Sequence, residues 1–96
     1  MVDHLVLFAA REDAPPNEIE DLISSLKSLK SEVSTVVDMS VGEDFSGRAG
    51  EYTHALFARF DDRDGLKEYL GHPAHLAVVE KLDRLTTGRI VADYEV

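Results

Sequence analysis

The chain contains no cysteine, and this absence excludes disulfides, thiolate nucleophiles and zinc–thiolate sites. It also has no long apolar run, because Leu5–Ala10 is too short for a membrane span or for the apolar core of a signal peptide. The preceding residues, Met1–His4, include no lysine or arginine. We therefore expect a cytoplasmic protein that has no membrane segment.

Basic side chains are scarce, with 10 lysines and arginines against 19 acidic residues and a net charge of −9. This charge repels phosphate backbones and anionic lipids, so nucleic-acid and membrane-surface roles are excluded. The glycine-rich segment Gly42–Glu51 lacks the lysine and the spacing of a phosphate-binding loop, and nucleotide binding has no support. We interpret this segment as a flexible loop that could close over a site.

A length of 96 residues corresponds to one domain, residues 1–96, with a single small core. Such a short chain buries its apolar surface incompletely. A partner that covers the remaining surface is therefore expected.

The hydrophobic spacing predicts the order βαββαβ. The long helix follows Pro15 and Pro16, and the second helix is broken in two and ends near Leu85. The expected strands are Val2–Ala10, Thr35–Val41, Tyr52–Phe60 and Gly88–Val96. This order predicts an α+β, ferredoxin-like fold with a four-stranded antiparallel sheet and its helices on one face. Because the first and third strands carry apolar side chains on both faces, the open face is predicted to pack against a second copy, giving a homodimeric α/β barrel.

The break in the second helix is the most distinctive stretch of the sequence. Proline disfavours helical backbone in the residue before it, so one helix should end at Gly71 and His72, and Pro73 should open the next. Tyr69 and His75 then lie in apolar stripes on either side of the break and should face inward. His72 is expected near the helix N-cap.

A phenol and an imidazole at one break suit proton-transfer chemistry. A neutral His75 can accept a proton, while the Tyr69 hydroxyl can donate a hydrogen bond to a developing enolate or oxyanion. The alternative is that both rings bond each other or nearby backbone and only lock the break. His72 and His75 are spaced like metal ligands, but no third ligand is evident, so no metal and no other cofactor is expected.

Four stretches together resemble the stress-responsive A/B barrel (Dabb) family, and the resemblance covers essentially the whole chain. They are Asp3–Phe8 (DHLVLF), Glu51–Leu56 (EYTHAL), Tyr69–His75 (YLGHPAH) and Val91–Val96 (VADYEV). The resemblance implies a dimeric ferredoxin-like barrel. Family members include plant stress-induced proteins, some of which form larger assemblies, many bacterial proteins, and a plant polyketide cyclase.

The cyclase implies a site in this chain. Its catalytic tyrosine and histidine correspond by motif to Tyr69 and His75, and histidines lining the same pocket correspond to His4 and His54. Neighbouring residues expected to contact a substrate are apolar: Val6, Leu56, Leu22, Ile23 and Leu26. The first helix departs from the cyclase, because it offers aliphatic residues and serines where the cyclase uses aromatic side chains to hold a substrate tail.

Two hypotheses from different classes follow. The first is a small-molecule protein that binds a carbonyl or aromatic compound between sheet and helices, with cyclase-like or isomerase-like acid/base chemistry and no cofactor. The second is a non-enzymatic, stress-associated structural protein whose dimer or higher assembly is the function. A cofactor-free monooxygenase of quinols, built on a similar barrel, is a third alternative that the H-P-A-H break makes less attractive.

Overall fold

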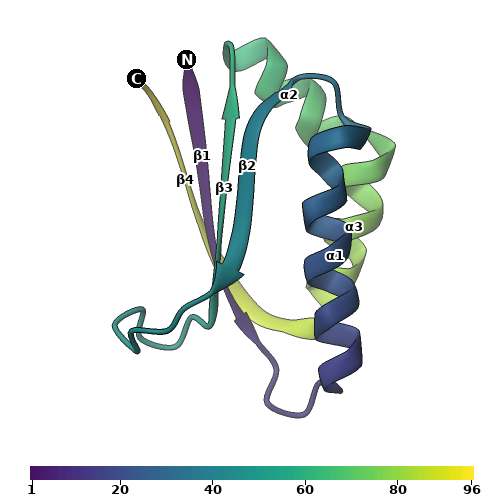
Figure 1. Ribbon diagram of the computed structural model, residues 1–96, viewed down its shortest axis with the longest axis vertical. Helices are drawn as coiled ribbons and strands as arrows, with labels where there is room; N and C mark the ends of the chain where they lie inside the picture. Colours follow the sequence, from purple (N-terminus) through teal and green to yellow (C-terminus); the bar gives the residue numbers. More distant parts are fainter.

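The computed structural model describes residues 1–96 and has one antiparallel sheet with all helices on one face (Figure 1). The elements run in the order β1 (Val2–Ala10), α1 (Pro16–Glu32), β2 (Val36–Glu43), β3 (His54–Phe60), α2 (Arg63–Gly71), α3 (Pro73–Leu85) and β4 (Thr86–Glu95). The sheet order is β2-β3-β1-β4. The predicted ferredoxin-like fold is therefore confirmed, including the break in the second helix. No helix has the length and apolar character needed to cross a membrane.

Strands β2, β3 and β4 differ from their predicted bounds. Strand β2 spans Val36–Glu43 rather than Thr35–Val41. Strand β3 begins at His54 rather than Tyr52, because the Thr53 side chain takes over part of the pairing: its Oγ1 accepts from the Ala10 N–H at 2.9 Å. Strand β4 begins directly after α3, at Thr86 instead of Gly88, and its register against β1 shifts between Ala9 and Ala10.

The core lies between the sheet and the helices. Alternate residues of β1 and β3 point into it, and Phe8, Ala58 and Phe60 are almost completely buried. Apolar stripes of α1 and α3 meet them, at the spacing expected of amphipathic helices. The helical residues buried there are Leu22, Leu26, Leu29, Val78, Leu82 and Leu85.

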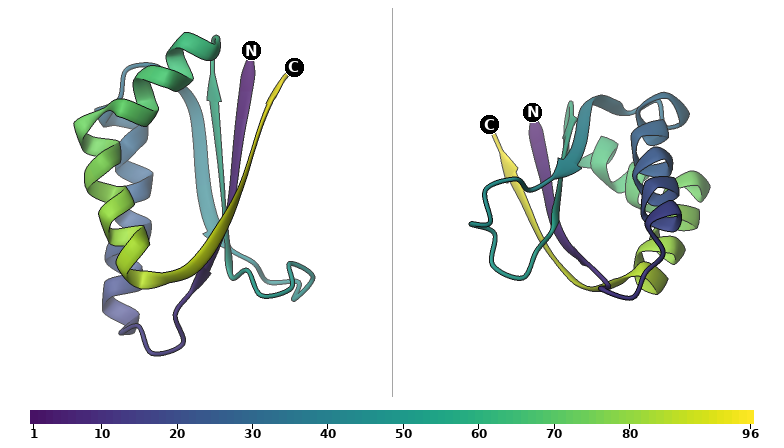
Figure 2. Two further views of the ribbon diagram at one scale, coloured as in Figure 1. Left: turned by 180° about the vertical axis from the view of Figure 1, so that it is seen from behind. Right: turned by 60° about the horizontal axis from the view of Figure 1, so that its bottom comes forward.

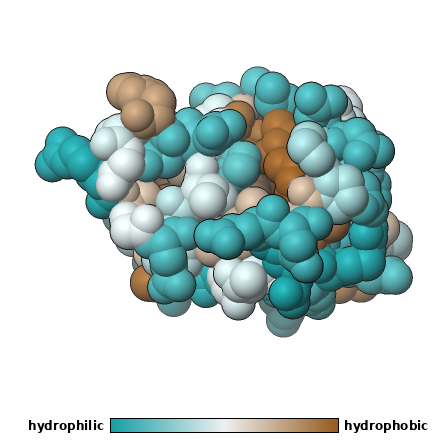
Figure 3. Space-filling view, turned by 90° about the horizontal axis from the view of Figure 1, so that it is seen from below, coloured by the Kyte–Doolittle hydropathy of each residue, from teal (hydrophilic) through white to brown (hydrophobic).

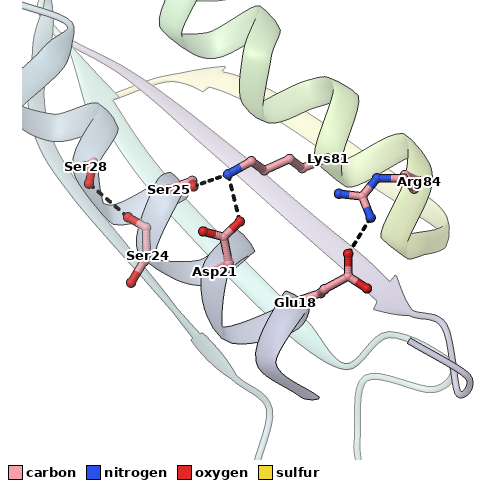
Figure 4. Close-up of polar contacts among 7 residues, drawn as sticks. All are labelled: Glu18, Asp21, Ser24, Ser25, Ser28, Lys81 and Arg84. Atoms are coloured by element: carbon pink, nitrogen blue, oxygen red, sulfur yellow. Dashed lines mark hydrogen bonds and ion pairs between the residues drawn. The ribbon is translucent and has the colours of Figure 1, made fainter. Parts of the chain in front are cut away.

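Polar side chains tie α1 to α3 across the outer surface of the helix layer (Figure 4). The Lys81 Nζ donates to the Asp21 carboxylate at 2.7 Å and to the Ser25 hydroxyl at 2.9 Å. One turn further on, the Arg84 guanidinium donates to Glu18 at 2.7 Å. These contacts link the N-terminal half of α1 to the C-terminal half of α3.

The connection between β2 and β3, residues 44–53, projects from the side of the sheet opposite the helices (Figures 1 and 2); we call it the β2–β3 arm. The sequence predicted that this segment could close over a site; in the structure it lies on the side of the sheet away from the space between sheet and helices (Figures 1 and 2). Gly47 and Gly50 adopt positive φ angles of 70° and 64°, which only glycine reaches without strain.

Candidate active site

The helix break brings Tyr69 and His75 together. His72 has extended backbone, and its Nδ1 accepts from the Ala74 N–H at 3.0 Å, so it caps α3 as predicted. At the other end of α2, the Asp62 side chain accepts from the Gly65 N–H at 2.8 Å. With both ends fixed, the rings of Tyr69 and His75 lie 4.4 Å apart, inclined at 51°.

Tyr69 is 1% exposed and packs against Phe60, with ring centroids 5.0 Å apart. Burial raises the pKa of its hydroxyl to about 12, so the group stays protonated and is a hydrogen-bond donor at neutral pH. The hydroxyl takes part in no hydrogen bond within the chain, yet the protein buries no unpaired side-chain oxygen or nitrogen. The hydroxyl must therefore reach open space, and the cavity described below is the space that Tyr69 borders.

His75 is held by one ring nitrogen. Its Nδ1 lies 3.1 Å from the Leu70 carbonyl oxygen, which can only accept, so Nδ1 carries the proton and Nε2 is left as an acceptor. Burial lowers the pKa of His75, and the bond to Leu70 opposes this only in part. The ring is thus neutral near pH 7 and can accept a proton at Nε2. The same bond also locks the break, as the structural alternative predicts.

His4 adds a third ring to this group. It is 4% exposed, and its ring centroid lies 6.0 Å from that of Tyr69, edge to face at 68°. His4 and Asp93 are register partners on β1 and β4, and the His4 Nδ1 bonds the Asp93 carboxylate. The carboxylate fixes the ring and leaves Nε2 as the free nitrogen.

Sequence reasoning missed the role of Asp93. The residue lies in one of the stretches that carry the family resemblance, but its contact with His4 depends on how β4 pairs with β1. Only a correct register for two strands 89 positions apart would have revealed it.

These rings border one cavity of about 30 Å³, room for roughly two water molecules. Apart from His4, Tyr69 and His75, its lining is apolar: Val6, Phe8, Leu26, Leu56, Val78, Val79 and Leu82. The cavity thus has three polar groups capable of proton transfer or hydrogen bonding in an otherwise apolar space, a combination typical of small-molecule sites.

The other predicted site residues are divided between the cavity and the surrounding core. Val6, Leu26 and Leu56 line the cavity, whereas Leu22 and Ile23 belong to the core around it.

His54 also lies outside the cavity lining. Its ring stacks on Phe8 at 5.0 Å and bonds the Thr53 hydroxyl at 2.7 Å. Burial lowers the pKa of His54. No group of three or more histidine or acidic side chains is arranged to hold a metal ion.

The opposite face of the sheet is uncovered and largely apolar. A groove of about 360 Å³ follows it, bordered by residues that include Leu5, Leu7, Phe57 and Ile90. By contrast, hydrophilic residues cover most of the end of the molecule shown in Figure 3, where an apolar strip lies in a hollow.

One ion pair stands on the open face. Asp3 is 3% exposed and accepts two hydrogen bonds from Arg59, at 2.6 and 2.8 Å. This bidentate contact is the main cause that lowers the pKa of Asp3.

Among curated proteins, the chain is 32% identical over 97 residues to the Streptomyces coelicolor protein SCO4036, covering 99% of both chains. It is 29% identical over 82 residues to a stress-response A/B barrel domain-containing protein of Arabidopsis thaliana. That alignment covers 84% of this chain but only 31% of the longer Arabidopsis protein.

Among solved structures, a dimeric ferredoxin-like protein from Thermobifida fusca superposes with a TM-score of 0.87 at 25% identity, covering 99% of this chain and 90% of that one. A hydroxynitrile lyase from Passiflora edulis superposes with a TM-score of 0.91 at 18% identity, covering 99% and 92%. The second likeness concerns the fold alone.

The sequence model for the stress responsive A/B barrel domain matches residues 2–96, almost the entire chain. The predicted family resemblance is therefore confirmed, and the protein belongs to the stress-responsive A/B barrel (Dabb) family.

Proposed function

We propose that the protein is a homodimer in which each subunit binds a small carbonyl compound in the cavity and moves a proton on it, with His75 as base and Tyr69 as hydrogen-bond donor. One observation carries the proposal: Tyr69, whose hydroxyl is protonated and unbonded, and His75, whose Nδ1 is bonded and whose Nε2 is free, both line the same apolar cavity. No cofactor is needed for such chemistry.

The proton transfer follows from the two rings. His75 Nε2 takes a proton from the carbon next to the carbonyl group, and the electron pair of the broken C–H bond becomes the C=C bond of an enolate. The carbonyl oxygen gains the negative charge and accepts a hydrogen bond from the Tyr69 hydroxyl. Return of the proton elsewhere gives isomerisation, and attack of the enolate carbon on a second carbonyl gives an aldol product.

The apolar walls strengthen both interactions. With little water in the cavity, a hydrogen bond from Tyr69 to a developing oxyanion acts in a low dielectric. His4, whose Nδ1 bonds the Asp93 carboxylate, leaves Nε2 as an acceptor that can bind a hydroxyl group of the substrate. The hydroxynitrile lyase from Passiflora edulis has the same fold, so this scaffold can carry an enzyme.

Cavity size limits the substrate class. About 30 Å³ accepts the reactive end of a small aldehyde or ketone, and anything longer requires the surrounding aliphatic side chains to move. We therefore propose short aliphatic carbonyl compounds in preference to the aromatic compounds of our first hypothesis.

Hydrogen–deuterium exchange tests this activity without a known product. The protein is incubated in D₂O with acetone, propanal or acetylacetone, and loss of the α-proton signal is followed by NMR. His75→Ala should slow the protein-dependent exchange about 100-fold or more, and Tyr69→Phe roughly tenfold or more. Exchange at the rate of buffer alone with all three compounds would contradict the proposal.

The matched control is His72→Asn. Asparagine retains an acceptor for the N-cap of α3, and His72 is not part of the cavity lining. This variant should exchange protons at the wild-type rate. A loss equal to that of His75→Ala would show that the break matters only for folding.

The open face supports the pairing of two copies. Its groove of about 360 Å³ is lined almost entirely by hydrophobic residues, as expected of an interaction surface, and related solved structures are described as dimeric. Analytical ultracentrifugation should give twice the chain mass, and Phe57→Asp, which places a charge in the groove, should give the monomer.

A structural role through assembly is the second candidate. The small volume of the cavity favours it, because side chains of the protein itself fill most of the space between sheet and helices. Light scattering that shows a species larger than a dimer, together with no exchange activity, would support this role over the first.

A further inference from the structure

The β2–β3 arm is built as an ordered projection. The Asp44 carboxylate accepts hydrogen bonds from the Ser46 hydroxyl at 2.7 Å, the Ser46 N–H at 3.2 Å and the Gly47 N–H at 3.0 Å. These bonds lower the pKa of Asp44, so the carboxylate stays charged. At the base, the Asp44 N–H donates to the Thr53 carbonyl at 2.9 Å. The arm is thus closed on itself and fixed where it leaves the sheet.

The arm holds one large apolar side chain entirely in water. Phe45 is 102% exposed, whereas the other exposed large hydrophobic residues lie between 41% and 67%. An apolar projection stands out on the side of the molecule where the arm lies (Figure 3). A phenyl ring contributes to stability only when it is removed from water. In an isolated subunit the exposed ring would therefore contribute no hydrophobic free energy.

We propose that the β2–β3 arm of each protomer docks on the partner subunit, with Phe45 as its apolar anchor. This inference rests on the proposed homodimer. The arm reaches past the open face, on the side away from the helices, and so extends toward whatever covers that face (Figures 1 and 2). Its root adjoins the apolar groove, since Thr53 is followed by His54 and by Ala55, which lines the groove. In a two-fold dimer the contact is made twice.

The charges of the arm argue against a lipid surface as the occupant. Residues 44–53 carry Asp44 and Glu51 against one basic side chain, Arg48, and Glu43 directly precedes them. Such a segment is repelled by anionic headgroups, and a single phenyl ring gives little insertion energy. A second copy of the chain, whose open face is apolar, suits the ring better.

Tryptophan fluorescence tests the contact directly, because the chain contains no tryptophan. In Phe45→Trp the only indole reports on the arm. We expect its emission maximum to lie at shorter wavelength in the dimer than in the Phe57→Asp background, which should be monomeric. The matched control is Leu76→Trp, 54% exposed on α3 and on the helix side of the molecule, whose emission should not change.

A second variant measures the strength of the contact. Phe45→Ser should raise the dimer dissociation constant roughly tenfold or more in sedimentation equilibrium, since each dimer loses two apolar anchors. Leu76→Ser should leave it unchanged, and equal thermal stability of the two variants would show that neither acts through folding.

These experiments distinguish docking of the β2–β3 arm from formation of the homodimer. A stable dimer in which the indole of Phe45→Trp emits as in the monomer, and in which Phe45→Ser dissociates like the wild type, overturns the docking of the arm and leaves the homodimer standing. A wild-type chain that is monomeric at all concentrations overturns both. A blue shift confined to the dimer, with weaker pairing of Phe45→Ser, supports the inference.

Discussion

Polar side chains are arranged differently on the two faces of the sheet. On the helix side, polar rings are buried among aliphatic residues, and His4, Tyr69 and His75 converge on one cavity. On the open side, the polar groups form an ion pair, Asp3 with Arg59, beside an apolar groove. The first arrangement leaves hydrogen-bonding capacity free for a ligand, whereas the second satisfies the charges and leaves the apolar surface free for a partner.

The largest expected effect tests which face carries the stability of the subunit. Phe60→Ala removes a completely buried ring on the helix side and should lower the free energy of unfolding by about 3–5 kcal/mol in urea denaturation. Phe57→Ala on the open side should cost far less when both are measured at concentrations where the chain is monomeric. Equal losses would mean that the open face contributes to the subunit core.

The histidines on the helix side should make stability depend on pH. Burial lowers the pKa of both His54 and His75 below 6.5, so the unfolded chain takes up these protons first, and stability should fall as the pH decreases from about 7 toward the lowered values. His75→Asn, compared with the wild type between about pH 7.5 and 5.5, should weaken this dependence. An unchanged pH dependence would show that His75 titrates alike in both states.

The ion pair on the open side should respond to acid in a lower range. The pKa of Asp3 is lowered from 3.8, so its stabilising contribution is present above that value and is lost as the pH falls through the lowered pKa. Asp3→Asn should therefore be less stable than the wild type at neutral pH, and the difference should narrow below pH 3.8. Asp61→Asn, an exposed aspartate without a side-chain hydrogen bond, is the control.

The smallest effect belongs to the outer surface of the helix layer. Lys81→Gln removes the contact with Asp21, but both side chains are partly exposed, so the loss should be about 0.5 kcal/mol and should shrink in high salt. Thermal denaturation at two salt concentrations measures it. A loss above about 2 kcal/mol would show that the surface link between α1 and α3 holds the cavity closed.

The fold could be predicted from local patterns, because the sequence features that determine its strands and its helix break each span only a few residues. Strand β1 was predicted with its observed bounds from the alternation of its side chains, and the Gly71–Pro73 sequence predicted the helix break, since proline disfavours helical backbone before it. The start of β3 was missed by two residues because the Thr53 side chain, rather than its strand propensity, decides the pairing there.

Site geometry was less accessible because it depends on contacts between distant strands. Tyr69 and His75 were predicted together since only one helix break separates them, whereas the Asp93 contact requires the β1–β4 register. The same alternation that turns His4 inward also turns His54 inward, yet only His4 reaches the cavity, because His54 stacks on Phe8.

The bidentate Asp3–Arg59 pair has a consequence for what can settle on the open sheet. The Arg59 side chain is 37% exposed, so any partner that covers this face must desolvate the guanidinium. A purely apolar surface cannot replace the lost hydrogen bonds to water, whereas a second copy of the chain can offer charged groups of its own. We therefore expect Arg59 to disfavour nonspecific association of apolar surfaces through this face.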